Sequence, residues 1–108
     1  MRVAVFSDVH GNLTALEAVL EDIGGRSVDK IVFAGDLCVL GPRPTACIHL
    51  VQGTPITNIY GNTDDWVLNR QESPQQLTAL AQWTLDQLDD GDRRWLDELP
   101  FSHRISPT

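Results

Sequence analysis

The sequence has few basic residues. Eight lysines and arginines stand against fifteen aspartates and glutamates among 108 residues, and the net charge is −7. Proteins that bind nucleic acid broadly gather lysine and arginine on one face, so the composition argues against an extended nucleic-acid surface. It does not exclude a small phosphate ester, because bound divalent cations can reverse the local electric field.

Long hydrophobic runs and clustered cysteines are also missing. No apolar stretch approaches the roughly 18 residues of a membrane span, and Met1 leads directly into a predicted strand without a signal segment. We therefore expect a cytoplasmic protein that does not contact a membrane. Cys38 and Cys47 form no CxxC pair, so small buried thiols are a better interpretation than a disulfide or a zinc site.

Three short polar motifs are present, and each follows a run typical of a buried strand. The motifs are about 30 residues apart, which is the length of one β-helix-β unit. In a parallel sheet the carboxyl ends of the strands meet at one edge, where α/β proteins keep their ligands. The predicted strands span residues 2–7, 30–34 and 54–60, and the motifs are Asp8-Val9-His10, Gly35-Asp36 and Gly61-Asn62-Thr63-Asp64.

The segments between and after these motifs are predicted to be helical. Asn12 is the expected N-cap of a helix ending at Ile23, and a second helix spans Thr45–Gln52. After the third motif, the pattern predicts a helix from Ser73-Pro74 to Leu88, a break at Asp90-Gly91, a short helix capped by Asp92, and a fourth strand over Phe101–Ser106. The sequence thus predicts an α/β fold with parallel βαβαβ units and an unfinished sheet.

The chemistry of the motifs indicates a metal site. In an extended segment, residues two apart project to one side, so Asp8 and His10 could hold one cation. Asp36 could bridge two cations with both carboxylate oxygens, and Asn62 could contact the second cation and a substrate phosphate. A carboxylate with an imidazole suits Mn²⁺, Fe or Zn²⁺. Two such cations polarise a phosphoryl group and activate water.

The set DVH, GDL and GNTD resembles the first three signatures of the calcineurin-like metallophosphoesterases, and DVHGN resembles the small bacterial and archaeal phosphodiesterases of that superfamily. The resemblance implies half of a β-sandwich flanked by helices, with two divalent ions, Mn first and Fe, Zn or Ni as alternatives. It implies that Asp8 and His10 bind the first metal, Asp36 bridges both, and Asn62 binds the second metal and the substrate. The implied substrate is a phosphate-ester small molecule or a nucleotide.

Two departures qualify the resemblance. Thr63 stands where many members have a histidine that protonates the leaving group, oriented by the acid that is Asp64 here. Asn62 and Asp64 are then the implied catalytic residues, and a diester with a good leaving group is the favoured substrate. The histidine ligands of the later GHTH-like motif are missing, so residues 1–108 are expected to be the amino-terminal portion of the domain, and the activity of this chain alone is open.

Two alternatives remain. One is a noncatalytic metal- or phosphate-binding interaction module, which could associate with itself or with another chain through an exposed sheet edge. The other is a Rossmann-like nucleotide-binding domain, which is disfavoured because no glycine-rich loop follows the first strand.

Overall fold

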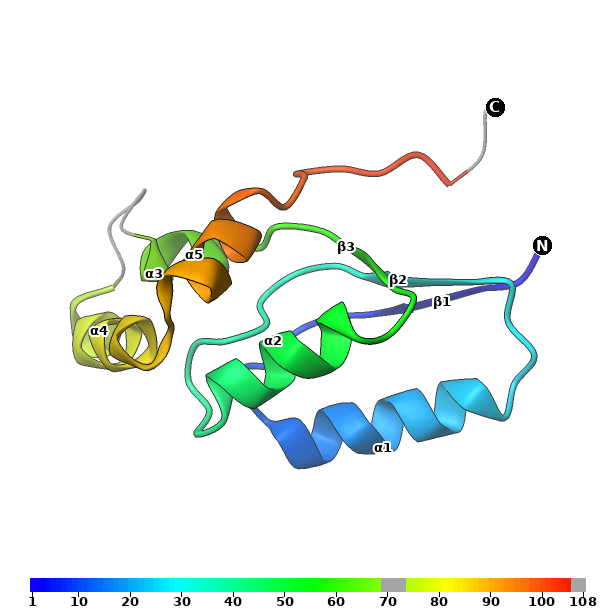
Figure 1. Cartoon of the computed structure of the whole chain (residues 1–108), viewed down its shortest axis with the longest axis horizontal. Helices are drawn as coiled ribbons and strands as arrows, with labels where there is room; N and C mark the ends of the chain where they lie inside the picture. Colours follow the sequence, from blue (N-terminus) through cyan, green and yellow to red (C-terminus); the bar gives the residue numbers. More distant parts are fainter. Residues whose placement is uncertain (69–73, 106–108) are drawn as a thin grey trace.

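A three-stranded parallel sheet forms the centre of the computed structural model, which describes residues 1–68 and 74–105 (Figure 1). The strands are β1 (Val3–Phe6), β2 (Lys30–Phe33) and β3 (Thr57–Asn58), in the order β1-β2-β3. Val3 lies opposite Lys30, and Phe33 lies opposite Asn58. All three carboxyl ends therefore lie at the same edge, and the predicted α/β class is confirmed.

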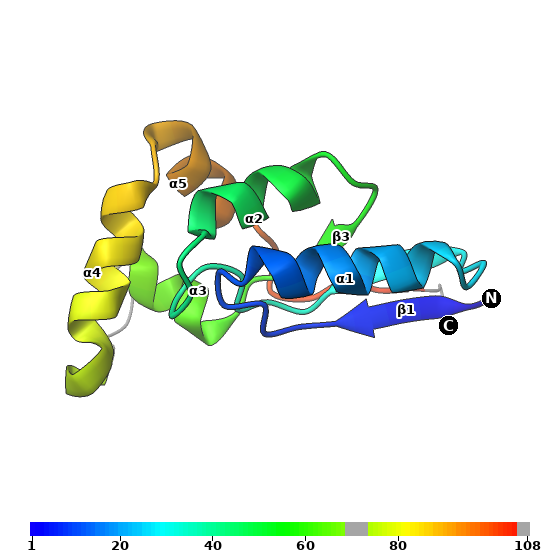
Figure 2. The ribbon, with the colours of Figure 1, turned by 90° about the horizontal axis from the view of Figure 1, so that it is seen from below.

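Two helices connect the strands, and both lie on one face of the sheet (Figures 1 and 2). They are α1 (Leu13–Gly24) and α2 (Pro44–Gln52). Asn12 is the N-cap of α1, because its side chain accepts a hydrogen bond from the Ala15 N–H at 3.0 Å. Gly53 follows α2 as its C-cap. These boundaries confirm the sequence-based assignment of both crossovers.

The hydrophobic core lies between the sheet and these helices and continues toward the carboxyl edge of the sheet. Its fully buried members come from strands, helices and the loop after β2, so that loop is packed into the core. They are Leu16, Phe33, Leu37, Cys38, Val39, Cys47, Ile48, Val51, Val67 and Leu96.

Further helices gather near the carboxyl ends of the strands (Figure 1). They are α3 (Asn62–Val67), a short 3₁₀ turn (Gln75–Leu77), α4 (Thr78–Gln87) and α5 (Asp90–Asp97). Helix α3 was not predicted, because its six residues are too few to show the periodic spacing of apolar positions that marks a helix. It follows the third motif directly and so places that motif at a helix start.

The predicted boundaries of α5 were wrong. Asp89, rather than Asp92, is the N-cap, and Asp90-Gly91 lies inside the helix instead of breaking the chain. The Asp89 carboxylate accepts a hydrogen bond from the Asp92 N–H at 2.7 Å, and Asp92 accepts one from the Asp89 N–H at 3.1 Å. This reciprocal capping stabilises the first turn and offsets the helix-weakening effect of Gly91.

The carboxyl-terminal strand prediction was also wrong for the residues that can be compared. Residues 101–105 form no strand, although the Tyr60 N–H donates to the Pro100 carbonyl at 2.8 Å. Strand β3 begins later than expected because Pro55 has no N–H to donate, and beyond its end the Ile59 N–H still donates to the Phe33 carbonyl at 2.9 Å. Ser73 and Ser106 lie outside the described residues. Within residues 1–68 and 74–105, none of the helices has the length and apolar character that crossing a bilayer requires.

Candidate metal centre

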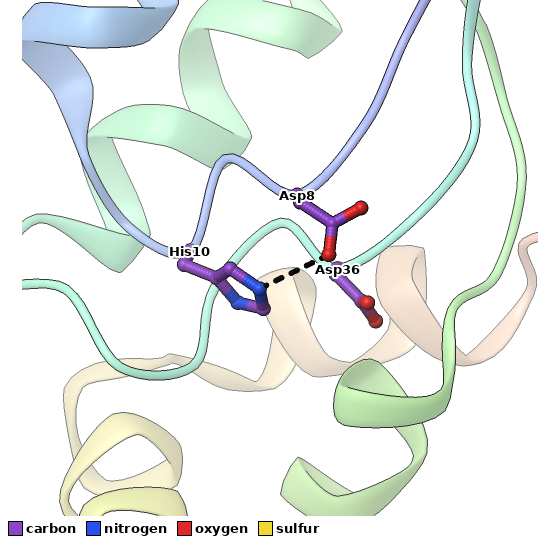
Figure 3. Close-up of side chains that lie close together, drawn as sticks. All are labelled: Asp8, His10 and Asp36. Carbon is purple, nitrogen blue, oxygen red and sulfur yellow. Dashed lines mark ion pairs between the residues drawn. The ribbon is translucent and has the colours of Figure 1, made fainter.

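Asp8, His10 and Asp36 meet at the carboxyl edge of the sheet (Figure 3). Asp8 and His10 lie in the loop after β1, and Asp36 lies in the loop after β2. One ligand atom from each of the three side chains lies within 4.8 Å of the other two. His10 Nε2 is 3.3 Å from Asp8 Oδ1. The structure thus brings together three of the residues that the sequence singled out.

The backbone at these three positions is left-handed, with φ of 60° at Asp8, 50° at His10 and 64° at Asp36. The expectation that Asp8 and His10 converge along an extended segment was therefore wrong, since β1 ends at Phe6. A left-handed residue other than glycine costs roughly 1–2 kcal/mol. Such strain is typical of functional sites held by their surroundings. Here the Asp8 N–H donates to the Gly35 carbonyl and the His10 N–H to the Asp36 carbonyl, both at 3.0 Å.

Glycines let the three loops approach one another. A Cβ at Gly35, whose φ is +103°, would lie 2.7 Å from the Gly61 backbone, and a Cβ at Gly61 would collide with Asp36. A Cβ at Gly41 would collide with the His10 carbonyl and with Gly11. The loops therefore contact each other backbone to backbone, which no larger residue permits.

The His10 ring is oriented by the loop after β2. Its Nδ1 lies 2.9 Å from the Val39 carbonyl oxygen, which can only accept a hydrogen bond. Nδ1 must then carry the proton, and the lone pair of Nε2 is directed toward the carboxylates. This is the arrangement that outer partners give to metal-binding histidines.

Asp8 is the more exposed of the two carboxylates. Its side chain is 59% exposed, and its Oδ2 accepts a hydrogen bond from the Ser7 hydroxyl at 2.5 Å. This hydrogen bond lowers the pKa of Asp8. Asp8 is therefore ionised at neutral pH and available as an anionic ligand.

Asp36 is held at one of its two carboxylate oxygens. Oδ1 accepts hydrogen bonds from the Thr63 N–H at 3.0 Å and from the Thr63 hydroxyl at 2.7 Å. The Asn62 amide also faces this carboxylate, and its nitrogen can donate to both oxygens at 3.2 Å. A half-turn of the amide presents its oxygen to the same space, as a cation ligand requires.

Asp64 lies behind the cluster and is completely buried. Its oxygens accept hydrogen bonds from the N–H groups of Gly61 at 2.9 Å, Asp36 at 3.0 Å and Leu37 at 3.1 Å. Burial raises the pKa of Asp64, and these hydrogen bonds oppose that rise. The carboxylate joins the loops after β2 and β3, and it has no surface to offer a substrate.

The cluster has the character of a divalent-cation site. Asp8 and Asp36 are like charges at close range, and no lysine or arginine of the described residues forms an ion pair with either. A divalent cation would remove their repulsion, and a carboxylate-imidazole donor set suits Mn²⁺, Fe or Zn²⁺.

Cys38 and Cys47 are free and buried, as the sequence predicted, and burial raises the pKa of both thiols.

The sequence did not reveal the partners of the candidate ligands. The Val39 carbonyl and the Thr63 hydroxyl contact His10 and Asp36 directly, but the sequence analysis assigned neither group a contact with these side chains. Position alone pointed to Thr63, which lies beside Asn62 in the third motif. No signal pointed to Val39, because every residue has a carbonyl.

Two aspartates and a histidine lie at the carboxyl edge of a parallel sheet. The structure is therefore that of an α/β protein with a candidate metal centre at the ends of its strands. Residues 1–96 match the calcineurin-like phosphoesterase superfamily domain. The chain therefore belongs to the calcineurin-like phosphoesterase superfamily, whose members typically bind metal ions.

Individual relatives support this membership. An uncharacterised protein of Methanocaldococcus jannaschii is 36% identical over 102 residues, which are 92% of this chain and 42% of that protein. A metallophosphoesterase structure from Sphaerobacter thermophilus is 39% identical with a TM-score of 0.74, over 93% of this chain and 41% of that one. A structure provisionally described as a diadenosine tetraphosphatase is 26% identical with a TM-score of 0.70, over 92% and 43%. The chain thus spans less than half the length of these relatives.

Proposed function

We propose that this chain supplies one side of a dinuclear metal centre that hydrolyses phosphodiesters. The observation that carries the proposal is the convergence of Asp8, His10 and Asp36 within 4.8 Å, on a domain that belongs to the calcineurin-like phosphoesterases. In this proposal Asp8 and His10 hold the first cation, and Asp36 lies between the two. Asn62 binds the second cation and the substrate phosphate.

Bound divalent cations would neutralise the phosphoryl oxygens and lower the pKa of water at the site. The protein's own groups orient the reaction. His10 is held by Val39 with Nε2 facing the cluster, and Asp36 is held at Oδ1 by Thr63. The Asn62 amide adjoins Asp36, where its nitrogen could donate to a phosphoryl oxygen. Preorganised groups of this kind contribute most when charge develops in the transition state.

The preference for diesters depends on Thr63. Its hydroxyl donates to Asp36 Oδ1 at 2.7 Å, and a hydroxyl has no pKa suited to protonating a leaving group. A diester with a good leaving group needs less protonation of its leaving oxygen than a monoester with a poor leaving group does. The proposed role of Asp64, predicted as catalytic, is to position the loops, because three backbone N–H groups occupy its carboxylate.

The remaining parts of the proposal concern the setting. We propose Mn²⁺ as the metal, the cytoplasm as the location, and residues 1–108 as the amino-terminal portion of the catalytic domain. The share of the relatives' length that the chain spans, 41–43%, supports the last point. Further ligands would then come from residues beyond this portion or from another chain.

Asp36→Asn tests the proposal, with Glu21→Gln as the matched control. Both changes replace a carboxylate by an amide, but Glu21 is exposed on α1 and lies outside the cluster. Calorimetric titration with Mn²⁺ should show at least about 100-fold weaker binding for Asp36→Asn, since loss of an outer partner alone costs 10–100-fold. Glu21→Gln should bind Mn²⁺ as the unchanged protein does.

Hydrolysis of bis-(p-nitrophenyl) phosphate with Mn²⁺ is measured on the same three proteins. We expect any hydrolysis by the unchanged chain to be matched by Glu21→Gln and to be lost in Asp36→Asn. Equal Mn²⁺ affinity in all three proteins would refute the metal centre. Metal binding without hydrolysis would refute catalysis by this chain while leaving the metal centre in place.

A further inference from the structure

A pocket of about 360 Å³ adjoins the candidate metal centre. Its lining residues are Tyr60, Gly61, Asn62, Asp65 and Phe101. Asn62 belongs both to this pocket and to the group around Asp36. A phosphate ester bound at Asn62 would therefore have one of its substituents beside the pocket. The volume falls in the range of small-molecule sites, 300–1,000 Å³.

Two aromatic rings form the apolar part of the pocket. The ring centroids of Tyr60 and Phe101 are 5.1 Å apart at an interplanar angle of 77°, an edge-to-face contact. Tyr60 is buried, but Phe101 is 72% exposed. A phenylalanine that is held by a tyrosine and still presents most of its surface is available to stack on another flat ring.

The polar part of the pocket disfavours a second phosphate. Among the described residues of the lining, Asp65 is the only charged one, and its Oδ1 accepts a hydrogen bond from the Tyr60 hydroxyl at 3.1 Å. A carboxylate repels anions and accepts hydrogen bonds from N–H and O–H donors. The occupant that fits is an uncharged, flat ring with such donors on its edge.

We propose that this pocket binds the nucleobase of a nucleoside phosphodiester. The base stacks on Phe101 and donates a hydrogen bond to Asp65, while its phosphate lies at Asn62. The inference rests on the proposed function for the position of the phosphate. It goes beyond that function by naming the substrate class: a nucleoside carried on a single phosphodiester, rather than a polyphosphate or an aliphatic ester.

A second pocket provides the control. It has a volume of about 340 Å³ and is lined by Leu40, Gly41, Pro42, Leu80, Trp83 and Thr84. Trp83 is 43% exposed there, so it is a second aromatic side chain open to a stacked base. This pocket includes none of the candidate ligands, and we therefore expect it to take no part in nucleotide binding.

The test is calorimetric binding of adenosine 5′-monophosphate and ribose 5-phosphate in the presence of Mn²⁺. The two compounds carry the same phosphate and differ in the base. The unchanged protein should bind the nucleotide about tenfold more tightly, as one base-aromatic stack supports. Phe101→Ala should abolish that difference without changing the affinity for ribose 5-phosphate, and Trp83→Ala should preserve it. Both side chains are exposed enough for these changes to leave the fold intact.

The outcomes separate this inference from the proposed function. Equal affinity for both compounds, or a preference lost in Trp83→Ala and kept in Phe101→Ala, would overturn the base pocket alone. A preference that depends on Phe101 in a protein that hydrolyses no diester would support the pocket and overturn the catalytic proposal. Binding of neither compound would overturn the base pocket, whereas the proposed function is decided by the Mn²⁺ binding and diester hydrolysis of the unchanged chain and Asp36→Asn.

Discussion

At the residue scale, Thr63 determines how Asp36 presents its charge. Two hydrogen bonds from Thr63 end on Oδ1, and its N–H and hydroxyl supply them at 3.0 and 2.7 Å. Oδ2 receives no hydrogen bond from Thr63 and faces the Asn62 amide, whose nitrogen can donate to it at 3.2 Å. Oδ2 therefore accepts fewer hydrogen bonds than Oδ1, and the bridge through both oxygens stays a prediction. Thr63 thus positions a candidate ligand of the metal centre.

Thr63→Val tests this role. Valine keeps the shape and the backbone N–H but removes the hydroxyl donor, so the Asp36 carboxylate gains rotational freedom. We expect Mn²⁺ affinity to fall about tenfold, the lower end of the effect of losing an outer partner. Thr63→Ser retains the hydroxyl and should restore most of the affinity. A serine variant as weak as the valine variant would attribute the loss to packing of the buried side chain instead.

Asp64 has a different role at the same scale, because it stabilises the fold around the site. Asp64→Ala would leave the N–H groups of Gly61, Asp36 and Leu37 without their acceptor. Each unsatisfied buried donor costs about 1–3 kcal/mol, and we expect the free energy of unfolding in urea to fall by about 3 kcal/mol. Among the described residues, the carboxylate of its neighbour Asp65 accepts a hydrogen bond only from the Tyr60 hydroxyl, so Asp65→Ala should cost no more than about 1 kcal/mol. An equal loss of unfolding free energy in the two variants would contradict the role of Asp64 in holding the loops together.

At the element scale, glycine contacts decide whether the strand-end loops can meet. A Cβ on Gly61 would collide with the Asp36 backbone nitrogen and Oδ1, although Gly61 has an ordinary φ of −104°. The collision involves a candidate metal ligand, so a change at this one position should affect both the packing of the loops and the site.

Gly61→Ala should therefore lower the free energy of unfolding by about 2 kcal/mol, as overpacking in a closed interior does, and weaken Mn²⁺ binding with it. Gly24→Ala is the control, since a Cβ at this last residue of α1 meets nothing within 4 Å. Alanine is about 1 kcal/mol more favourable than glycine in a helix interior, so this variant should be neutral or stabilised. Chemical denaturation of both variants checks the contrast, and an unaffected Gly61→Ala would show that the loops can separate without cost.

The elements also show how far the sequence could be interpreted. The period of apolar residues and the cap at Asn12 were sufficient for α1, and the strand-end motifs were sufficient for the convergence of Asp8 and Asp36. Left-handed backbones at Asp8 and His10 could not be predicted, because they depend on hydrogen bonds to the loop after β2. The same holds for the Val39 carbonyl, whose contact with His10 arises only from tertiary packing.

At the scale of the whole molecule, the acidic composition and the candidate site both favour binding of a cation over binding of an anion at the sheet edge. The net charge of −7 disfavours further anions near the sheet edge, where Asp8 and Asp36 already lie close together. The loops after β1, β2 and β3 are joined there by glycine contacts and by the hydrogen bonds of Asp64. A cation held by side chains from two of these loops would join them further, and its binding energy would add to the stability of the folded chain.

Mn²⁺ should therefore raise the melting temperature of the whole chain. A ligand at 100 times its dissociation constant adds about 2.7 kcal/mol when it binds only the folded state. For a domain of about 100 residues, each kcal/mol corresponds to about 4–8 °C, so an increase on the order of 10 °C is expected at saturating Mn²⁺. Calorimetric melting at constant ionic strength separates this effect from general screening of the negative charge. Asp36→Asn should show no comparable increase. An equal increase in both proteins would mean that Mn²⁺ acts on the acidic surface as a whole and not on the cluster at the sheet edge.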